Sequence, residues 1–568
     1  MTIHPFSDAS FFTQNHLAIA AAYCRSLDVM GIVNKVVPTS MELSAGMMVQ
    51  AMVLDVLSGR SPLYRVEQFW EQQDKLLLLG NDVSSHLFND TNLGRGLDAI
   101  FEAGSSKIIT ELGISASKVF NLDMSAVSYD TTSTSVWGEY RGSEYNPPVE
   151  GPRIVRGHSK DLRPDLKQFM TELLCVERGV PIFTTTLDGN SSDKRSNNKI
   201  LTRIGSIMAR HGLGAGAFVY VADSAMVTVE NLSLLDETRF VSRLPGNFSV
   251  CAQVVDHAVD SEEWEHLGRL AELDSSRVAA EYKAHETTVE IENNTYRAVV
   301  IHSNSHDKRR QKAIDRKQEK SLKEITALTK GLQVRYFCEH DAMIAVQAML
   351  RIKTSLHTLR ASYKETKVNK RGRPPKGGSQ PTNTYYDLVY EILIREDRLQ
   401  QLRERSGCFV LLSNVPSFGE DSLDSKALLR TYKGQYGVES DFCFLKDPLV
   451  VNDLFLKTQS RIDALGMILV VALLIWRLME RQMRLYLNNE NKVLPGWDNK
   501  PTDRPTSFMM STVFSGILIA RIKHGESFLL NPLSDRQIQF LAALGLDENV
   551  FLEKDVACVL QCRGIPDD

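Results

Sequence analysis

The sequence lacks the features that define several common classes of protein. It contains no Gly-x4-Gly-Lys-Ser/Thr loop, which argues against nucleotide-driven machinery and against a nucleotide cofactor. Its glycine-rich run, Gly212–Gly216, precedes a predicted strand, whereas a dinucleotide-binding loop follows one. The longest apolar run, Ala464–Trp476, has 13 residues, short of the ~18 or more that a membrane span needs. We therefore expect this run to form a buried helix, and we expect no membrane partner.

Cysteine is scarce and scattered. The eight cysteines form no disulfide framework, and the closest pairs, Cys558/Cys562 and Cys338/His340, have no second pair of metal ligands near them. The first residues contain no basic stretch followed by an apolar core, so nothing marks the chain for secretion. We expect a protein of a reducing cytoplasm.

The chain also has no strong excess of charge of one sign. It carries 66 Lys and Arg against 70 Asp and Glu, and its hydrophobic fraction of 43% is that of an ordinary globular protein. At 568 residues it is long enough for three or four domains. The net charge of −4 argues mildly against a protein coated in nucleic acid. Local basic patches matter more, because patches are what neutralise phosphates.

One part of the chain has a clear order of strands and helices. Three β-prone runs, then a helix, then a fourth strand are predicted, with the strands at 124–137, 168–176, 181–187 and 217–221. The helix follows from the apolar spacing of Ile200, Ile204, Ile207 and Met208, and it ends at Gly212. This is the opening order of the ribonuclease H-like fold, an α/β fold with a mixed sheet flanked by helices. That fold carries one acid on its first strand and another at the end of its fourth.

Acidic residues stand at both of these positions. Asp130 lies inside the first strand, and Asp223 directly follows the fourth. An acid in or at the end of an apolar strand costs desolvation energy, so it is rarely kept without a partner. Two acids at matching positions therefore suggest a metal site.

A third acid lies far downstream, in a mostly helical segment over 424–445. Tyr432, Gln435, Glu439 and Lys446 follow one another at offsets of 3, 7 and 14 residues. At 3.6 residues per turn, these offsets place the four side chains along one helical face. Such a face offers an acid for metal, a cation for phosphate and an aromatic hydroxyl for the DNA backbone.

At this point the sequence resembles the insertion-sequence DDE transposases, whose third acid stands in the signature Tyr-x2-Arg-x3-Glu-x6-Lys. Tyr432, Glu439 and Lys446 fit that spacing, and Gln435 stands where the family has arginine. Further segments resemble the family in the same order: Tyr129–Thr132, Gly157–Asp161, Arg163–Leu166, Asp188–Asn190, Ala222–Ala225 and Ser242–Pro245. The resemblance extends from about residue 120 to 490.

The resemblance implies a DNA transposase that cleaves transposon ends and joins them to target DNA. Asp130, Asp223 and Glu439 would be its catalytic residues and would hold two Mg²⁺ or Mn²⁺ ions, with Asp130 bridging them. Tyr432 and Lys446 would orient the scissile phosphate. The implied partners are double-stranded DNA and a second copy of the chain, so the cytoplasmic protein would associate with the nucleoid when it acts.

The predicted domain organisation has five parts. They are a helical N-terminal domain at 1–117, the first part of the catalytic core at 118–240, a β-rich insertion domain at 241–420, the second part of the core at 421–490, and a C-terminal region at 491–568. The insertion is expected to contain a hairpin, 287–292 with 296–302, and strands at 333–338 and 407–414. A long helix is expected over 451–487, with Arg477, Arg481 and Arg484 on its exposed extension.

Two basic segments lie in the predicted insertion. Residues 308–323 contain eight Lys or Arg, among them Lys308, Arg309 and Arg310, and form either a solvated helix face or a DNA-backbone contact. The apolar stripe expected on this helix consists of Ile314, Leu322, Ile325 and Leu328.

The second basic segment, Lys370–Gly378, resembles an AT-hook. Arg371 and Arg373 would enter the minor groove of A·T-rich DNA. A flexible basic linker is the alternative.

Two other functions use the same features. A metal-dependent ribonuclease H-like nuclease would use the same three acids without strand transfer, so an assay for joined products separates the two. A catalytically silent DNA-binding derivative would bind DNA without cleaving it.

Overall fold

The computed structural model describes residues 9–140, 150–214, 216–235, 237–261, 263–270, 280–371, 382–447, 456–522 and 527–558, without the side chains of 305–310. The chain divides into two compact units. The first consists of Met1–Ser242 and Leu428–Asp568, and the second of Arg243–Ala427.

The first unit contains a mixed sheet flanked by helices. Its strands are β2 (Ala126–Val136), β3 (Lys167–Val176), β4 (Val180–Leu187), β5 (Val219–Ala222) and β6 (Arg239–Arg243), in the order β4-β3-β2-β5-β6. β2 is antiparallel to β3, and β3 to β4, whereas β2, β5 and β6 are parallel. The four strands predicted in this region are confirmed.

Helix α8 (Asp193–Arg210) connects β4 to β5. The apolar face expected for it is confirmed, because Ile200, Ile204, Ile207 and Met208 are all buried. Strands β4 and β5 run in the same direction, because both are parallel to β2. The chain therefore needs a crossover such as α8 to return from the end of β4 to the end of the sheet at which β5 begins. A short helix, α9 (Val229–Ser233), then precedes β6.

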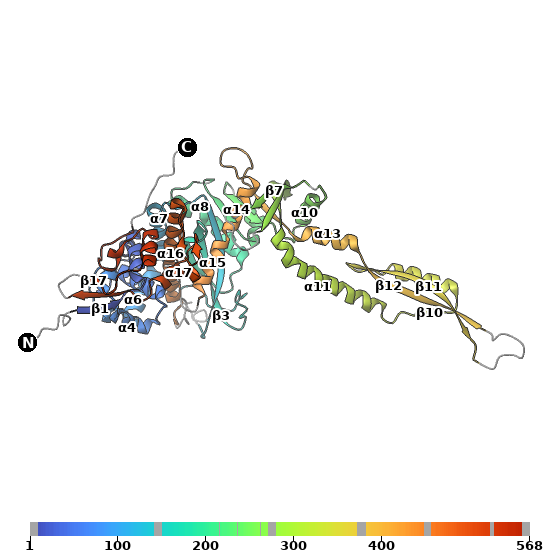
Figure 1. Ribbon diagram of the computed structural model, residues 1–568, viewed down its shortest axis with the longest axis horizontal. Coiled ribbons are helices and arrows are strands. Elements are labelled where there is room, and N and C mark those ends of the chain that lie inside the picture. The colour runs from blue at the N-terminus through green and yellow to red at the C-terminus, as the bar shows by residue number, and fades with distance from the viewer. Residues whose placement is uncertain are drawn as a thin grey trace, which may run out of the picture. The chain divides into compact units, whose positions relative to one another are not determined.

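The helices of the N-terminal part pack around one long helix near the other end of the chain. They are α1 (Leu17–Leu27), α2 (Val29–Val36), α3 (Ala45–Leu57), α4 (Val66–Glu71), α5 (Lys75–Leu79), α6 (Asp90–Ala103) and α7 (Ser105–Val119). The long helix is α16 (Gln459–Glu490), which contacts α1, α3, α6, α7 and also β4 (Figure 1). Helix α3 follows from the helical spacing of its apolar residues between Met47 and Leu57.

Helix α16 is the core of this unit. Its apolar stretch is long enough to cross a membrane, as is the bent pair of α1 and α2, but 78% of the residues in the most apolar part of α16 are buried inside the chain. The expectation of a buried helix is therefore confirmed for Ala464–Trp476. The helix begins at Gln459 and the described residues 456–458 are not helical, so the start predicted at 451 was wrong for these residues; 451–455 lie outside the described residues.

The expectation of exposed arginines on α16 was wrong for two of the three. The side chains of Arg477 and Arg481 are only 13% and 14% exposed, and each is paired with a carboxylate, Arg477 with Asp441 and Arg481 with Glu177. Arg484 is 43% exposed. Arg477 and Arg481 are enclosed because each lies against an acid from a neighbouring element.

The end of the chain completes this unit. Its elements are β14 (Leu494–Pro495), β15 (Pro501–Thr502), α17 (Ser507–Val513), β16 (Leu518–Ile522), β17 (Ser527–Leu529) and α18 (Asp535–Ala543). β16 pairs on one side with β17 and on the other with β1 (Ala9–Thr13), close to the N-terminus. The predicted C-terminal region and helical N-terminal domain thus share one small sheet.

The helical segment that carries the third acid is broken. It forms α14 (Ser425–Gly434) and α15 (Tyr436–Leu445). At Gln435 the backbone makes hydrogen bonds between residues three apart, from the N–H of Gln435 to the carbonyl of Tyr432 and from the N–H of Val438 to the carbonyl of Gln435. The prediction of one continuous helical face was therefore wrong. Close to this break, at Gly437, α15 approaches the β3–β4 turn so closely that a Cβ atom would lie 2.0 Å from the carbonyl oxygen of Arg178.

The second unit contains four antiparallel paired strands. Its strands are β7 (Glu265–Arg269), β8 (Glu281–Ile291), β9 (Asn294–Ser303) and β13 (Cys408–Ser413), in the order β13-β9-β8-β7. The predicted hairpin is confirmed as β8 and β9, and the predicted strand at 407–414 as β13. Helices α10 (Ser249–Ser261) and α13 (Glu396–Ser406) belong to the same unit.

A long helix and a second sheet make up the rest of this unit. They are α11 (Asn304–Thr329), β10 (Arg335–Tyr336), α12 (Glu339–Leu350), β11 (His357–Asn369) and β12 (Thr382–Ile394). The sheet order is β10-β12-β11, and β11 pairs with β12 along their whole length (Figure 1). This hairpin was not predicted, and its strands flank the basic segment at 370–378.

The apolar stripe predicted for α11 was half wrong. Ile314 and Ile325 are buried, but Leu322 and Leu328 are 44% and 54% exposed. The buried positions include the polar Ser321, which accepts the backbone N–H of Leu356. The buried face therefore could not be read from apolar residues alone.

We expect Gly437→Ala to destabilise the protein by about 1–3 kcal/mol, because the added methyl group must push α15 away from the β3–β4 turn. Gly434→Ala is the matched control, since a Cβ at Gly434 meets no atom within 4 Å and alanine is the better helix former. Urea unfolding of the two variants measures the difference. Equal midpoints for both would show that the close approach at Gly437 is not a constraint.

Candidate active site

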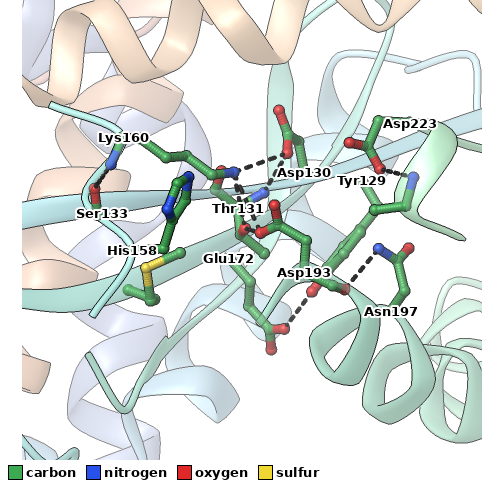
Figure 2. Close-up of polar contacts among 12 residues, drawn as sticks. Tyr129, Asp130, Thr131, Ser133, His158, Lys160, Glu172, Asp193, Asn197 and Asp223 are labelled. Atoms are coloured by element: carbon green, nitrogen blue, oxygen red, sulfur yellow. Dashed lines mark hydrogen bonds and ion pairs between the residues drawn. The ribbon is translucent and has the colours of Figure 1, made fainter. Parts of the chain in front are cut away.

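Asp130 and Asp223 lie at neighbouring positions on two parallel strands. β2 and β5 pair with Ala126 opposite Val219 and Ser128 opposite Val221. Continued by two residues, this register places Asp130 opposite Asp223, and adjacent strands lie about 4.8 Å apart. The structure thus brings together the first two predicted acids (Figure 2).

The carboxylate of Asp130 is largely buried, with its side chain 21% exposed. Its Oδ1 accepts the backbone N–H of Thr131 at 2.7 Å, and the Nζ of Lys160 lies 3.7 Å away. Burial raises the pKa of Asp130 to about 6; Lys160 opposes this shift, whereas the charges of Asp223 and Asp193 add to it. The site is an acidic pocket that favours a cation.

Asp223 is held by the turn that follows β5. Its Oδ1 accepts the backbone N–H of Ala225 at 3.0 Å, and its backbone carbonyl accepts the hydroxyl of Ser242 at 2.8 Å. Burial raises the pKa of Asp223, and the nearby charge of Asp193 raises it further. Both predicted acids are therefore more costly to ionise here than in water.

Two more residues join this pocket that the sequence-based prediction did not assign to it. Asp193, the first residue of α8, accepts the hydroxyl of Thr131 at 2.6 Å, and the Nζ of Lys160 lies 3.3 Å from its Oδ1 (Figure 2). Lys160 stood in the segment Gly157–Asp161 that resembles the family, and Asp193 precedes the apolar face predicted for α8. Their spacing along the chain gave no sign that they meet.

Glu439 lies on a helix that covers the same face of the sheet as Asp130. Side chains alternate along a strand, so Ser128 and Asp130 share a face. Cys175 lies opposite Ser128 and donates its thiol to Asp441 of α15 at 3.4 Å. Asp130 therefore faces α15, the helix that carries Glu439 two residues before Asp441.

The side chain of Glu439 is nevertheless exposed, and it makes no hydrogen bond or ion pair with the described residues. Within the described parts of the chain, no three His, Cys, Asp or Glu side chains are grouped closely enough to hold a metal ion. The structure brings Asp130 and Asp223 together but does not gather Glu439 with them. As carboxylates at neighbouring positions of two parallel strands, the first two fit a hard divalent cation, which prefers oxygen ligands.

Two other buried acids near the sheet are committed to structural partners. Asp441 is fully buried and accepts Arg477 Nε at 2.6 Å; burial raises the pKa of Asp441 to about 7, and Arg477 opposes this shift. Glu172 on β3 accepts the hydroxyl of Tyr129 and one nitrogen of Arg203, both at 2.9 Å. Neither acid is available to a ligand.

The other residues of the predicted signature lie on different elements. Tyr432 belongs to α14, Gln435 lies at the break before α15, and Lys446 caps the end of α15. Lys446 forms an ion pair with Asp161, the residue after Lys160. The predicted phosphate-binding lysine is thus next to the segment that supplies Lys160 to the acidic pocket.

The predicted DNA-binding residues of the basic segments belong to the second unit. Lys308, Arg309 and Arg310 lie in the first turns of α11, and their side chains are outside the described residues. Arg371 is exposed just after β11, whereas Arg373 lies outside the described residues.

Comparison with known proteins gives one family match. A domain of unknown function, DUF4277, matches residues 10–114, which comprise β1, α1 to α6 and most of α7. No curated protein matches the chain. The match covers the helical N-terminal part and none of the residues of the acidic pocket.

We expect Asp130→Asn to change the pH dependence of stability. Because the pKa of Asp130 is raised in the folded state, the stability that its proton provides is present at low pH and is lost as the pH rises from about 4 to about 6. Asparagine does not titrate. The free energy of unfolding of the variant minus that of the wild type should therefore be roughly 2 kcal/mol larger at pH 7.5 than at pH 4.5.

Urea unfolding at both pH values measures this gain. The control is Asp82→Asn, which changes an exposed carboxylate. Parallel stability curves for the wild type and Asp130→Asn would contradict the raised pKa.

Proposed function

We propose that this chain is a DNA transposase of the DDE type with a ribonuclease H-like catalytic core. The observation that carries the proposal is the strand order β4-β3-β2-β5-β6, with acids at adjacent positions of parallel β2 and β5. That order and those two positions are the ones the fold uses. The placement of α15 on the face of Asp130 supports Glu439 as the third acid.

The proposed chemistry is cleavage and joining of phosphodiester bonds. Asp130, Asp223 and Glu439 would hold Mg²⁺ or Mn²⁺, which when bound activates the attacking water or 3′-hydroxyl and stabilises the leaving oxygen. Because the side chain of Glu439 is exposed and is not grouped with the other two acids, it would have to move to join them. Lys446 and Tyr432 would hold the scissile phosphate.

The distribution of charge supports DNA as the partner. Residues 304–395, which we call the basic arm, carry 20 Lys and Arg against 9 Asp and Glu, whereas the rest of the chain carries 46 against 61. The net charge of −4 thus conceals a basic arm of +11. Lysine and arginine neutralise phosphates and release counterions, so such a segment fits a DNA backbone.

Helix α11 gives the basic arm an ordered basic face. Lys312, Arg316 and Lys323 are exposed and lie on one side of the helix, because their spacings of four and seven residues are close to whole turns. Ile314 and Ile325 are buried on the opposite side. Of the two readings of this segment, a solvated helix face and a contact with DNA, the concentration of charge favours the contact.

Single alanine substitutions of Asp130, Asp223 and Glu439 should each abolish nicking and joining while leaving DNA binding intact. The assay incubates the full chain and Mg²⁺ with a duplex that carries the ends of the element encoding it, and then maps nicks and joints. Asp82→Ala is the control, because its carboxylate is exposed and far along the chain from the three acids.

Each outcome of this assay has a distinct meaning. Nicks without joints in the wild type favour the nuclease, and binding without nicks in Mg²⁺ or Mn²⁺ favours the silent DNA-binding derivative. Cleavage that survives in Glu439→Ala removes that residue from the site.

A triple variant, Lys312→Ala, Arg316→Ala and Lys323→Ala, should bind DNA more weakly and with a lower salt dependence. The slope of log K against log salt should fall by up to about 3, since each lost phosphate contact changes it by roughly 0.9. The control removes the same charge from exposed lysines outside the basic arm, at Lys35, Lys118 and Lys554. An equal loss in both triple variants would argue for general electrostatics and against a contact through α11.

A further inference from the structure

Lys160 reaches the acidic pocket from a loop that is fixed on both sides of it. Its backbone N–H donates to the hydroxyl of Ser133 on β2 at 2.9 Å. The hydroxyl of the preceding Ser159 accepts the backbone N–H groups of Asp161 and Arg163. The loop is thereby tied to the strand that carries Asp130, and the lysine side chain extends along that strand (Figure 2).

The ammonium group of Lys160 is surrounded by oxygen atoms. Its Nζ lies 2.5 Å from the carbonyl oxygen and 3.2 Å from the hydroxyl oxygen of Thr131, 3.3 Å from Oδ1 of Asp193 and 3.7 Å from Oδ1 of Asp130. The hydroxyl of Thr131 donates to Asp193, so it can accept from the lysine. Two carboxylates, a carbonyl and a hydroxyl form the kind of shell that a metal cation also prefers.

Of these contacts, the one with Asp130 is the longest. At 3.7 Å it is an ion pair without a good hydrogen bond, whereas the contacts with Thr131 are within hydrogen-bond distance. The lysine is therefore anchored by Thr131 and Asp193 and neutralises Asp130 from one side. A cation that arrives at Asp130 has to compete with this charge.

We infer that Lys160 is a positioning residue that occupies the acidic pocket before a divalent ion does, and that Asp193 holds it when Asp130 turns to the ion. This inference rests on the proposed function, because it takes Asp130 and Asp223 as ligands of the ion. It assigns Asp193 to Lys160 and not to the metal. The lysine lowers the repulsion between the acids in the empty pocket and weakens the affinity of the pocket for metal.

The test measures binding of Mn²⁺ alone to the full chain without DNA, by the loss of the electron paramagnetic resonance signal of free Mn²⁺. Asp130→Ala and Asp223→Ala define the binding that belongs to this pocket. Lys160→Gln removes the charge but keeps a hydrogen-bonding side chain, and should tighten this binding roughly 10-fold. Lys160→Arg keeps the charge and should bind Mn²⁺ as the wild type does.

A double-mutant cycle separates the two roles of Asp193. Asp193→Asn should weaken Mn²⁺ binding in the wild type, because Lys160 then pairs with Asp130 alone, and should have no effect in Lys160→Gln. An equal loss in both backgrounds would make Asp193 a metal ligand and overturn its assignment. Unchanged or weaker binding by Lys160→Gln would overturn the role of the lysine.

This inference and the proposed function fail in different ways. If Asp130→Ala and Asp223→Ala leave Mn²⁺ binding intact, the proposed metal site itself is wrong. If they abolish it while Lys160→Gln binds as the wild type does, only the inference about Lys160 fails. Thermal unfolding of each variant identifies any that do not fold, and Lys160→Met then replaces Lys160→Gln as the neutral variant.

Discussion

The parallel pairing of β2 with β5 is the constraint on which the candidate site depends. Two strands that lie side by side and run in the same direction bring positions far apart in sequence to the same level, here Asp130 and Asp223. Such a connection needs a helix, here α8. This helix begins at the same end of the strands, so its first residue, Asp193, accepts the hydroxyl of Thr131 next to Asp130. Asp130 and Asp223 therefore meet through the topology of the sheet, Asp193 contacts the same lysine from the β2–β3 loop, and that lysine offsets part of the repulsion between the acids.

Helix α16 fixes the second part of the site. Arg477 of α16 binds Asp441 of α15, and Arg481 binds Glu177 in the β3–β4 turn and the carbonyl oxygen of Phe120 at the end of α7. Buried ion pairs are costly to form, but breaking one leaves a buried charge without a partner, so such pairs hold their elements in one arrangement. The arginines thus tie α15 to the sheet that carries the first two acids.

The two units divide the charge of the chain. The acids of the candidate site lie in the first unit, and the basic arm lies in the second. A site that binds metal needs concentrated negative charge, whereas a surface that binds DNA needs positive charge, and a single surface cannot offer both without loss. Under the proposed function, placing the two on separate units resolves this conflict, and the net charge of the whole chain then says little about the proposed partner, DNA.

Local patterns in the sequence determined the regular elements: four strands of the first sheet, α8 with its apolar face, α3, the β8–β9 hairpin and the buried core of α16. Each depends on residues close together in the chain, so periodicity was enough to predict it. Other features arise from contacts over long sequence distances: the close approach of Gly437 to Arg178; the burial of Arg477 and Arg481; the β11–β12 hairpin; and the meeting of Lys160 with Asp193. The sequence by itself thus determined many of the strands and helices and the positions of Asp130 in the first strand and Asp223 after the fourth. Only the tertiary structure decided which charges meet, because the energy of a buried charge depends on neighbours that spacing along the chain does not reveal.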